Sequence, residues 1–179
     1  MKQDLQLTVA LLERTPAVLD ALLRGLPDAW TLQNEGENTM SPWDVVGHLI
    51  HAERMDWIPR AKVILSGERK KFEAFDRWGH TREWQGKPIV ELLDEFARLR
   101  RENLAELRAM NVDENKLAFE GQHPSLGAVR LSELLATWAT HDLTHLHQIS
   151  RVLAHQYREA VGPWSRYLGV LQCAGHSAE

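Results

Sequence analysis

Three histidines fall within seven residues of the stretch THDLTHLHQI (residues 140–149), in a chain that has nine histidines in all. In an α-helix, His141 and His145 are one turn apart and differ by roughly 40° around the axis, whereas His147 lies roughly 120° away. Gln148 returns to within roughly 20° of His141. Two imidazoles and an amide therefore share one helix face, and His147 is predicted to point elsewhere.

The face that carries His141 and His145 is otherwise apolar, because Leu134, Trp138 and Val152 also lie on it. Polar side chains in the interior of a helix bundle are costly unless they are paired. Two histidines four residues apart can direct ring nitrogens at one point, which is the convergence that a divalent metal needs. The pattern therefore predicts a buried metal site with at least one further ligand on a facing helix.

A candidate for the third ligand lies in the stretch SPWDVVGHLIHAER, which starts at residue 41. His48 interrupts an apolar face that includes Val45 and Ala52. His51 lies roughly 60° to one side, near Asp44, and is the weaker candidate. His48 would complete a three-histidine site whose open positions are filled by water or substrate.

Two simpler interpretations compete with this site. A pair of histidines four residues apart is common by chance, and a single histidine on an apolar face is more often a hydrogen-bonded core residue. The remaining histidines are predicted to lie on the surface or in loops: His80, His123, His147, His155 and His176. If the site binds metal, zinc and nickel are favoured, with iron as an alternative, because imidazole suits all three.

The elements that must position these side chains are helical nearly throughout, since apolar residues recur at helical spacing and no run alternates with period two. Long helices are expected at residues 5–23, 41–65, 88–110 and 132–157, and a short final helix at 164–171. Pro16 should kink or break the first helix, and Pro59 should bend the second. Residues 111–130 form a long connection that could hold a short turn or ribbon. This order predicts an all-α fold, a four-helix bundle with a short C-terminal helix, in one domain spanning residues 1–179.

Composition narrows the class of protein. The 179 residues are 44% hydrophobic and 26% charged, as in an ordinary globular domain. The net charge of -4 offers no basic footprint for nucleic acid. No apolar run approaches the roughly 20 residues of a membrane span. The N-terminal stretch does not resemble a signal peptide, and the single cysteine, Cys173, excludes an intramolecular disulfide. A cytoplasmic location is therefore predicted.

The stretches SPWDVVGHLIHAE and HDLTHLHQI resemble the DinB-like superfamily of metal-binding four-helix bundles. In that family one histidine of the second helix and an HxxxH pair of the fourth hold a divalent metal, which by position implies His48, His141 and His145. Family members often have Arg-Gly before the glutamine, where this chain has Leu146 and His147. The resemblance also implies that the chain could form a homodimer.

The resemblance implies an activity as well. Similar bundles include S-transferases that use low-molecular-weight thiols such as bacillithiol or mycothiol, and a thiol-dependent maleylpyruvate isomerase. The expected function is thus a metal-dependent thiol S-transferase acting on small electrophiles, in which the metal holds the thiolate of the cosubstrate. No protein cysteine is needed for that chemistry.

Two alternatives stay open. A metal-dependent hydrolase would need a general base near the metal, and the nearest carboxylate, Asp44, could equally cap its helix or orient a ligand. A non-catalytic metal-binding stress protein would have a site closed by four protein ligands, with His51 as the candidate for the fourth. A site that instead opens on a cavity lined by Trp138, Met55 and residues 72–86 would favour an enzyme.

Overall fold

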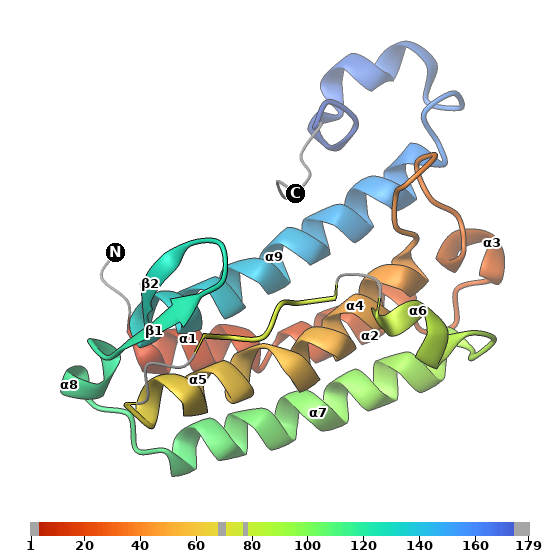
Figure 1. Ribbon diagram of the computed structural model, residues 1–179. Helices are drawn as coiled ribbons and strands as arrows, with labels where there is room; N and C mark the ends of the chain where they lie inside the picture. The colour runs from red at the N-terminus through yellow and green to blue at the C-terminus, as the bar shows by residue number, and fades with distance from the viewer. Residues whose placement is uncertain (1–3, 68–70, 77–78, 174–179) are drawn as a thin grey trace.

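The computed structural model describes residues 4–67, 71–76 and 79–173, without the side chains of residues 80–82. Four helical rods pack lengthwise into a bundle (Figure 1), and this confirms the predicted all-α four-helix bundle. The rods are α1 (Leu5–Leu12) with α2 (Thr15–Leu23), α4 (Pro42–Met55) with α5 (Trp57–Leu65), α7 (Ile89–Ala109), and α9 (Leu131–His155). Short helices lie in the connections: α3 (Asp28–Thr31), α6 (Gly79–Trp84) and α8 (Glu114–Leu117).

The first rod breaks where Pro16 predicts a break. Helix α1 ends at Leu12 and α2 begins at Thr15, with the proline in the first turn of α2. Proline has no N–H to give to the carbonyl four residues earlier. That carbonyl, of Leu12, instead accepts a hydrogen bond of 2.9 Å from Arg100 on α7.

The second rod begins at a capping box, in which Ser41 and Asp44 bond each other's backbone N–H groups. Asp44 is therefore a helix cap. The rod is interrupted at Asp56, three residues before the proline at which the sequence predicts a bend. The carbonyl that Pro59 leaves without a donor is that of Met55, four residues earlier, so the helix ends there.

Two apolar clusters fill the bundle, one toward each end. Along α7 and α9, a layer of polar side chains separates the residues of one cluster from those of the other. On α9, for example, Trp138 belongs to the first cluster and Ile149 to the second, and His141, Asp142 and His145 lie between them. The polar layer of the bundle is thus where the predicted site lies.

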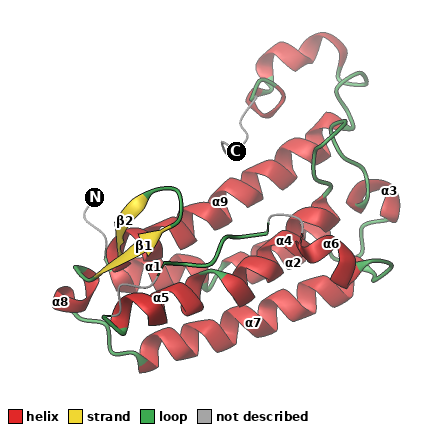
Figure 2. Cartoon of the chain, in the orientation of Figure 1, coloured by secondary structure: helices red, strands yellow, loops and turns green. Residues whose placement is uncertain are grey.

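The connection between α7 and α9 holds the ribbon that the sequence allowed, shown as two arrows in Figure 2. Strands β1 (Glu120–His123) and β2 (Gly127–Arg130) pair antiparallel. The backbone of β1 approaches the bundle so closely that a Cβ at Gly121 would lie 2.7 Å from atoms of Ile64 and Phe72. Phe72 also donates its backbone N–H to the carbonyl of Gln122 at 2.9 Å. The hairpin is therefore held against the segment that follows α5.

The short C-terminal helix that the sequence predicts is present as 3₁₀ helix. Residues 162–171 form two 3₁₀ segments, η1 (Gly162–Tyr167) and η2 (Gly169–Leu171), separated by Leu168. Gly162 has a left-handed φ of +51° and Pro163 follows it, so an α-helix cannot run through from α9. Within the described residues, no helix is long and apolar enough to cross a membrane.

Candidate metal centre

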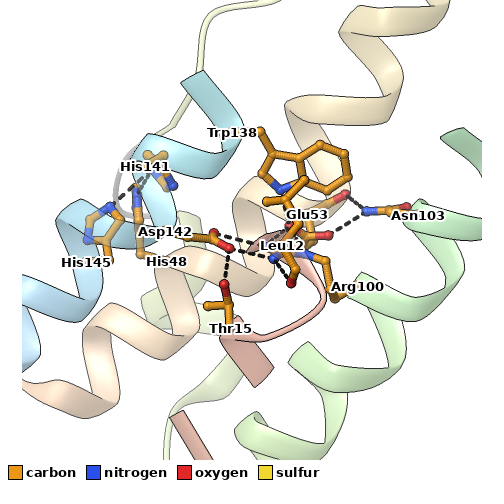
Figure 3. A network of polar contacts seen from close by, with 10 residues as sticks. All are labelled: Leu12, Thr15, His48, Glu53, Arg100, Asn103, Trp138, His141, Asp142 and His145. Atoms are coloured by element: carbon orange, nitrogen blue, oxygen red, sulfur yellow. Dashed lines mark hydrogen bonds and ion pairs between the residues drawn. The ribbon is translucent and has the colours of Figure 1, made fainter. Parts of the chain in front are cut away.

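The three histidines selected from the sequence meet in the polar layer between α4 and α9 (Figure 3). The Nε2 atom of His141 lies 3.2 Å from Nε2 of His48 and 3.1 Å from Nε2 of His145. Imidazole nitrogens about 2.0–2.1 Å from a tetrahedral zinc ion would be roughly 3.3 Å apart. The spacing of these nitrogens therefore fits three ligands of one metal ion.

Protonation of the rings also suits a metal. With Oε1 of Gln148 as acceptor at 2.8 Å, His145 carries its proton on Nδ1 and presents a lone pair at Nε2. A proton on Nε2 of His141 can be donated to only one of its two histidine neighbours. Nδ1 of His141 is buried and has no hydrogen-bond partner among the described residues. A cation at the point of convergence would satisfy all three facing nitrogens at once.

The electrostatic surroundings keep His141 neutral. Burial holds the pKa of His141 well below its usual value, and His145, His48 and Arg100 lower it further. A neutral imidazole is the form that binds a metal, because the ligating nitrogen must be unprotonated. At neutral pH the ring is therefore ready to act as a ligand.

The other candidates on these helices fall where the sequence reasoning puts them. His147 is exposed on α9. Gln148 bonds His145 and so orients it, which is the usual role of a residue that contacts a metal ligand. His51 is not among the described groups that converge, and its ring instead packs 5.0 Å from that of Phe75. A fourth protein ligand from His51 is therefore not supported.

Two predicted surface or loop histidines are also placed. His155 is half-buried at the end of α9, beside Arg158. His123 is half-buried at the end of β1 and reaches the site, as described below. His176 and the side chain of His80 lie outside the described part of the chain.

The histidine cluster opens on a cavity of about 520 Å³ between the bundle and two surface segments. The yellow-green segment that follows α5 in Figure 1 runs back along α4, and Phe75 in it packs edge-on against His48 at 5.4 Å. The cavity is lined by the three histidines, Asp56, Arg60, Ala74, Phe75 and residues 123–125. The lining predicted from the sequence is only partly correct. Ala74 and Phe75 of residues 72–86 line the cavity, but Trp138 and Met55 do not.

Asp56 supplies the carboxylate that sequence reasoning did not find. Its side chain is largely buried and pairs with Arg60 at 2.6 Å. Burial raises the pKa of Asp56 to about 6, although Arg60 acts in the opposite direction. The signal for this residue was Pro59, since the proline ends α4 just before Asp56 and releases it from the regular helix.

A second group of buried polar side chains lies beside the histidines (Figure 3). Arg100 on α7 pairs with Glu53 on α4 at 2.8 Å and with Asp142 on α9 at 2.5 Å. Burial lowers the pKa of Arg100, but the two carboxylates outweigh it and raise the pKa above its usual value. Both carboxylates have further donors: Thr15, Asn103 and Trp138. Asp142 follows His141 directly, so this network is joined to the histidine cluster through α9.

With this geometry established, the comparisons with known proteins identify the class. The profile of the DinB superfamily matches residues 11–149, and the chain belongs to that superfamily. The match includes the whole rod of α4 and α5 and residues 131–149 of α9, and with them all three converging histidines.

Solved structures show the same fold. The structure of YfiT from Bacillus subtilis, described as a probable metal-dependent hydrolase with an unusual four-helix bundle topology, is similar with a TM-score of 0.72. It is 18% identical, and the similarity covers 94% of this chain and 90% of YfiT. TT2238, described as a four-helix bundle protein, has a TM-score of 0.53 and 22% identity over 82% of this chain and 98% of its own. A comparison with curated proteins finds no match.

Proposed function

We propose that the chain is a metal-dependent hydrolase of small molecules, with a divalent ion held by His48, His141 and His145. The observation that carries this proposal is the position of Asp56, which lines the same cavity as the three histidines. The sequence favours thiol S-transfer mainly through the family resemblance, and it places no carboxylate squarely on the predicted ligand faces, Asp44 being the nearest. The description of YfiT as a probable metal-dependent hydrolase agrees with the proposal.

When bound at three imidazoles, a zinc or nickel ion polarises a carbonyl and makes water acidic enough to react near neutral pH. Asp56 takes up the proton that water loses on attack and returns it to the leaving group. A base works best when its pKa lies near the operating pH, and burial raises the pKa of Asp56 to about 6. Arg60 holds the carboxylate in place at 2.6 Å.

Thiol S-transfer is the second candidate, because three protein ligands leave room at the metal for the thiolate of a cosubstrate. The only cysteine of the chain, Cys173, is exposed in the C-terminal segment and does not line the cavity. Hydrolysis and thiol S-transfer differ in whether they need the carboxylate of Asp56 as a base. A metal lowers the pKa of a thiol without help from a base, so S-transfer does not depend on Asp56.

The test uses purified protein, stripped by a chelator and reloaded with zinc or nickel. Hydrolysis of 4-nitrophenyl esters and anilides is measured beside conjugation of low-molecular-weight thiols to monochlorobimane. We expect metal-dependent hydrolysis that rises with pH through about 6. Asp56→Asn should reduce it about 10²–10⁴-fold, the usual contribution of a general base.

Asp44→Asn is the matched control, because Asp44 caps α4 and does not line the cavity. Hydrolysis that survives Asp56→Asn would remove the proposed base. Metal-dependent thiol conjugation that is indifferent to Asp56 would establish the S-transferase instead. Stoichiometric metal binding without either reaction would point to a non-catalytic metal-binding protein.

A further inference from the structure

The cavity wall contributed by the hairpin carries a hydrogen-bond donor. Nδ1 of His123 accepts from the backbone N–H groups of Ser125 and Leu126, both at 3.2 Å. The ring proton is therefore on Nε2, which is the remaining polar group of a side chain that lines the cavity. The ring is also held edge-on against Phe72, with 6.2 Å between centroids. The turn thus orients His123 and fixes its tautomer.

The protonation of His123 agrees with this tautomer. Burial lowers the pKa of His123, and the nearby Arg60 lowers it further. The imidazole is therefore neutral at physiological pH and acts as a donor through one N–H. Among the described residues that line the cavity, the positively charged side chain is that of Arg60.

Arg60 has donors left over after its internal contacts. Its Nη2 pairs with Asp56 at 2.6 Å and approaches the carbonyl of Glu73 at 3.5 Å. Its guanidinium lies over the ring of Phe72, 5.3 Å from the centroid. Within the described residues, its Nε and Nη1 groups make no hydrogen bond, although a guanidinium has five N–H donors. Arg60 can therefore bind a further acceptor on the cavity side.

We propose that Arg60 and His123 together bind a carboxylate of the substrate, so that the substrates are small esters or amides carrying a carboxylate away from the scissile carbonyl. The proposal rests on the proposed hydrolase function, because it places the reacting carbonyl at the three histidines. Arg60 and His123 line the cavity with those histidines but come from different elements, α5 and the hairpin. They are specificity residues and take no part in proton transfer.

A carboxylate fits the charge of the cavity better than a phosphate does. Asp56 already offsets the single positive charge of Arg60. A group with one negative charge can share the guanidinium with Asp56, whereas a dianion would be repelled by the same carboxylate. The flat carboxylate also matches the planar fork of arginine.

Binding is tested without turnover. Glutarate and valerate differ only in that a second carboxylate replaces a methyl group, so their ratio reports recognition of that carboxylate. Calorimetric titration of the zinc-loaded protein should show glutarate binding at least about 10-fold more tightly, as one charge-assisted contact allows. His123→Phe should reduce the ratio severalfold, and His123→Gln, which keeps an acceptor and a donor, should restore it. His147→Phe, on the exposed side of α9, is the control and should leave the ratio unchanged.

The role of Arg60 needs a variant that leaves the cavity charge unchanged, because its removal alone would expose the charge of Asp56. The double variant Asp56→Asn/Arg60→Met removes one charge of each sign. We expect it to bind glutarate and valerate about equally. Equal binding of both ligands by the wild-type protein, or an unchanged preference in the double variant, would overturn the proposal.

The same comparison with substrates separates this proposal from the hydrolase itself. The wild-type protein should hydrolyse 4-nitrophenyl hemiglutarate with a higher kcat/KM than 4-nitrophenyl valerate, through a lower KM. Metal-dependent hydrolysis of both esters without preference would refute the carboxylate site and leave the hydrolase standing. Preferred binding of glutarate with no hydrolysis of any ester would refute the hydrolase and support the carboxylate site.

Discussion

Two groups of polar side chains lie next to each other in the same layer of the bundle, and they are completed in opposite ways (Figure 3). Around Arg100, the guanidinium faces Glu53, Asp142 and the carbonyl of Leu12, so every charged group has a partner of opposite sign. In the histidine cluster, nitrogens of one kind face each other at 3.1–3.2 Å. The polar groups around Arg100 satisfy one another within the protein, whereas the three facing nitrogens of the histidine cluster have the spacing that a metal cation would complete.

The difference separates two reasons for polarity inside a helix bundle. The Arg100 network connects α4, α7 and α9, and through Thr15 and the Leu12 carbonyl it also reaches the first rod. Because Asp142 directly follows His141 on α9 and Glu53 lies on the same helix as His48, the network fixes the axial and rotational positions of the helices that carry the histidines. We interpret the network as the support of the site and the cluster as the site.

The largest effect is expected from breaking the cluster. His141→Ala removes the nitrogen that lies next to both others, and stoichiometric zinc or nickel binding should be abolished. His145→Ala should have the same result, because two ligands seldom hold a metal. His147→Ala, two residues further along α9 and exposed, should bind one ion like the wild-type protein. Metal analysis of the purified variants is the measurement, and loss of metal on His147→Ala would contradict the assignment of helix faces.

Breaking the network should reduce stability, because its loss leaves two carboxylates buried without their cation. Arg100→Met is expected to lower the free energy of unfolding by about 3–5 kcal/mol. Arg98→Met is the matched control on the same helix, since Arg98 is 45% exposed and its pairs with Glu95 and Glu102 are at the surface. Arg98→Met should lower the free energy of unfolding by at most about 1 kcal/mol. Denaturant unfolding of both metal-free variants decides the matter, and equal losses would show that the network is not a support.

Asp56 shares a feature with each group. It is paired with an arginine, as the carboxylates around Arg100 are, and it lines the same cavity as the histidine cluster. Its pKa is about 6 in the fold against a usual 3.8, so its contribution to stability is fully present below about pH 4 and lost as the pH rises through 6. The free energy of unfolding of Asp56→Asn, measured relative to that of the wild-type protein, should therefore increase by up to about 3 kcal/mol between pH 4 and pH 7. Urea unfolding of the metal-free proteins across this range is the measurement. A difference that does not change with pH would show that burial leaves the carboxyl unperturbed.

The smallest effect is expected from removing the hydrogen bond between His145 and Gln148. Gln148→Ala removes the acceptor that fixes the tautomer of His145, and metal affinity should fall about 10–100-fold without loss of stoichiometry. Gln148→Glu keeps an acceptor and should retain affinity. Competition with a chelating dye measures both variants. An unchanged affinity in Gln148→Ala would show that the ring is oriented by packing alone.

Local rules were sufficient for the rods and for the inward-facing histidines. The 3.6-residue period and the two prolines indicated the four rods and their interruptions, because both act within a few residues of the chain. The same period separated His147 from His141 and His145. Periodicity also selected His48, because a histidine on an apolar helix face can be identified without knowing which helix that face packs against.

Contacts between distant segments could not be predicted in this way. Arg100 interrupts the apolar face of α7 between Phe96 and Leu104, but periodicity does not indicate which carboxylates on other helices would pair with it. It is buried because its position on α7 faces α4 and α9. Nothing in the sequence of the hairpin indicates that His123 lines a site. It reaches the cavity because Gly121 lets β1 approach Ile64.

The sequence by itself determined the rods, their breaks and three of the side chains that meet between them, because helix geometry depends only on residues within a turn or two. The tertiary structure alone decided which carboxylate shares the cavity, which carboxylates pair with Arg100 and which loop forms the opposite wall. Those outcomes depend on how α4, α7, α9 and the hairpin pack, and packing is set by contacts between residues 40 to 130 positions apart.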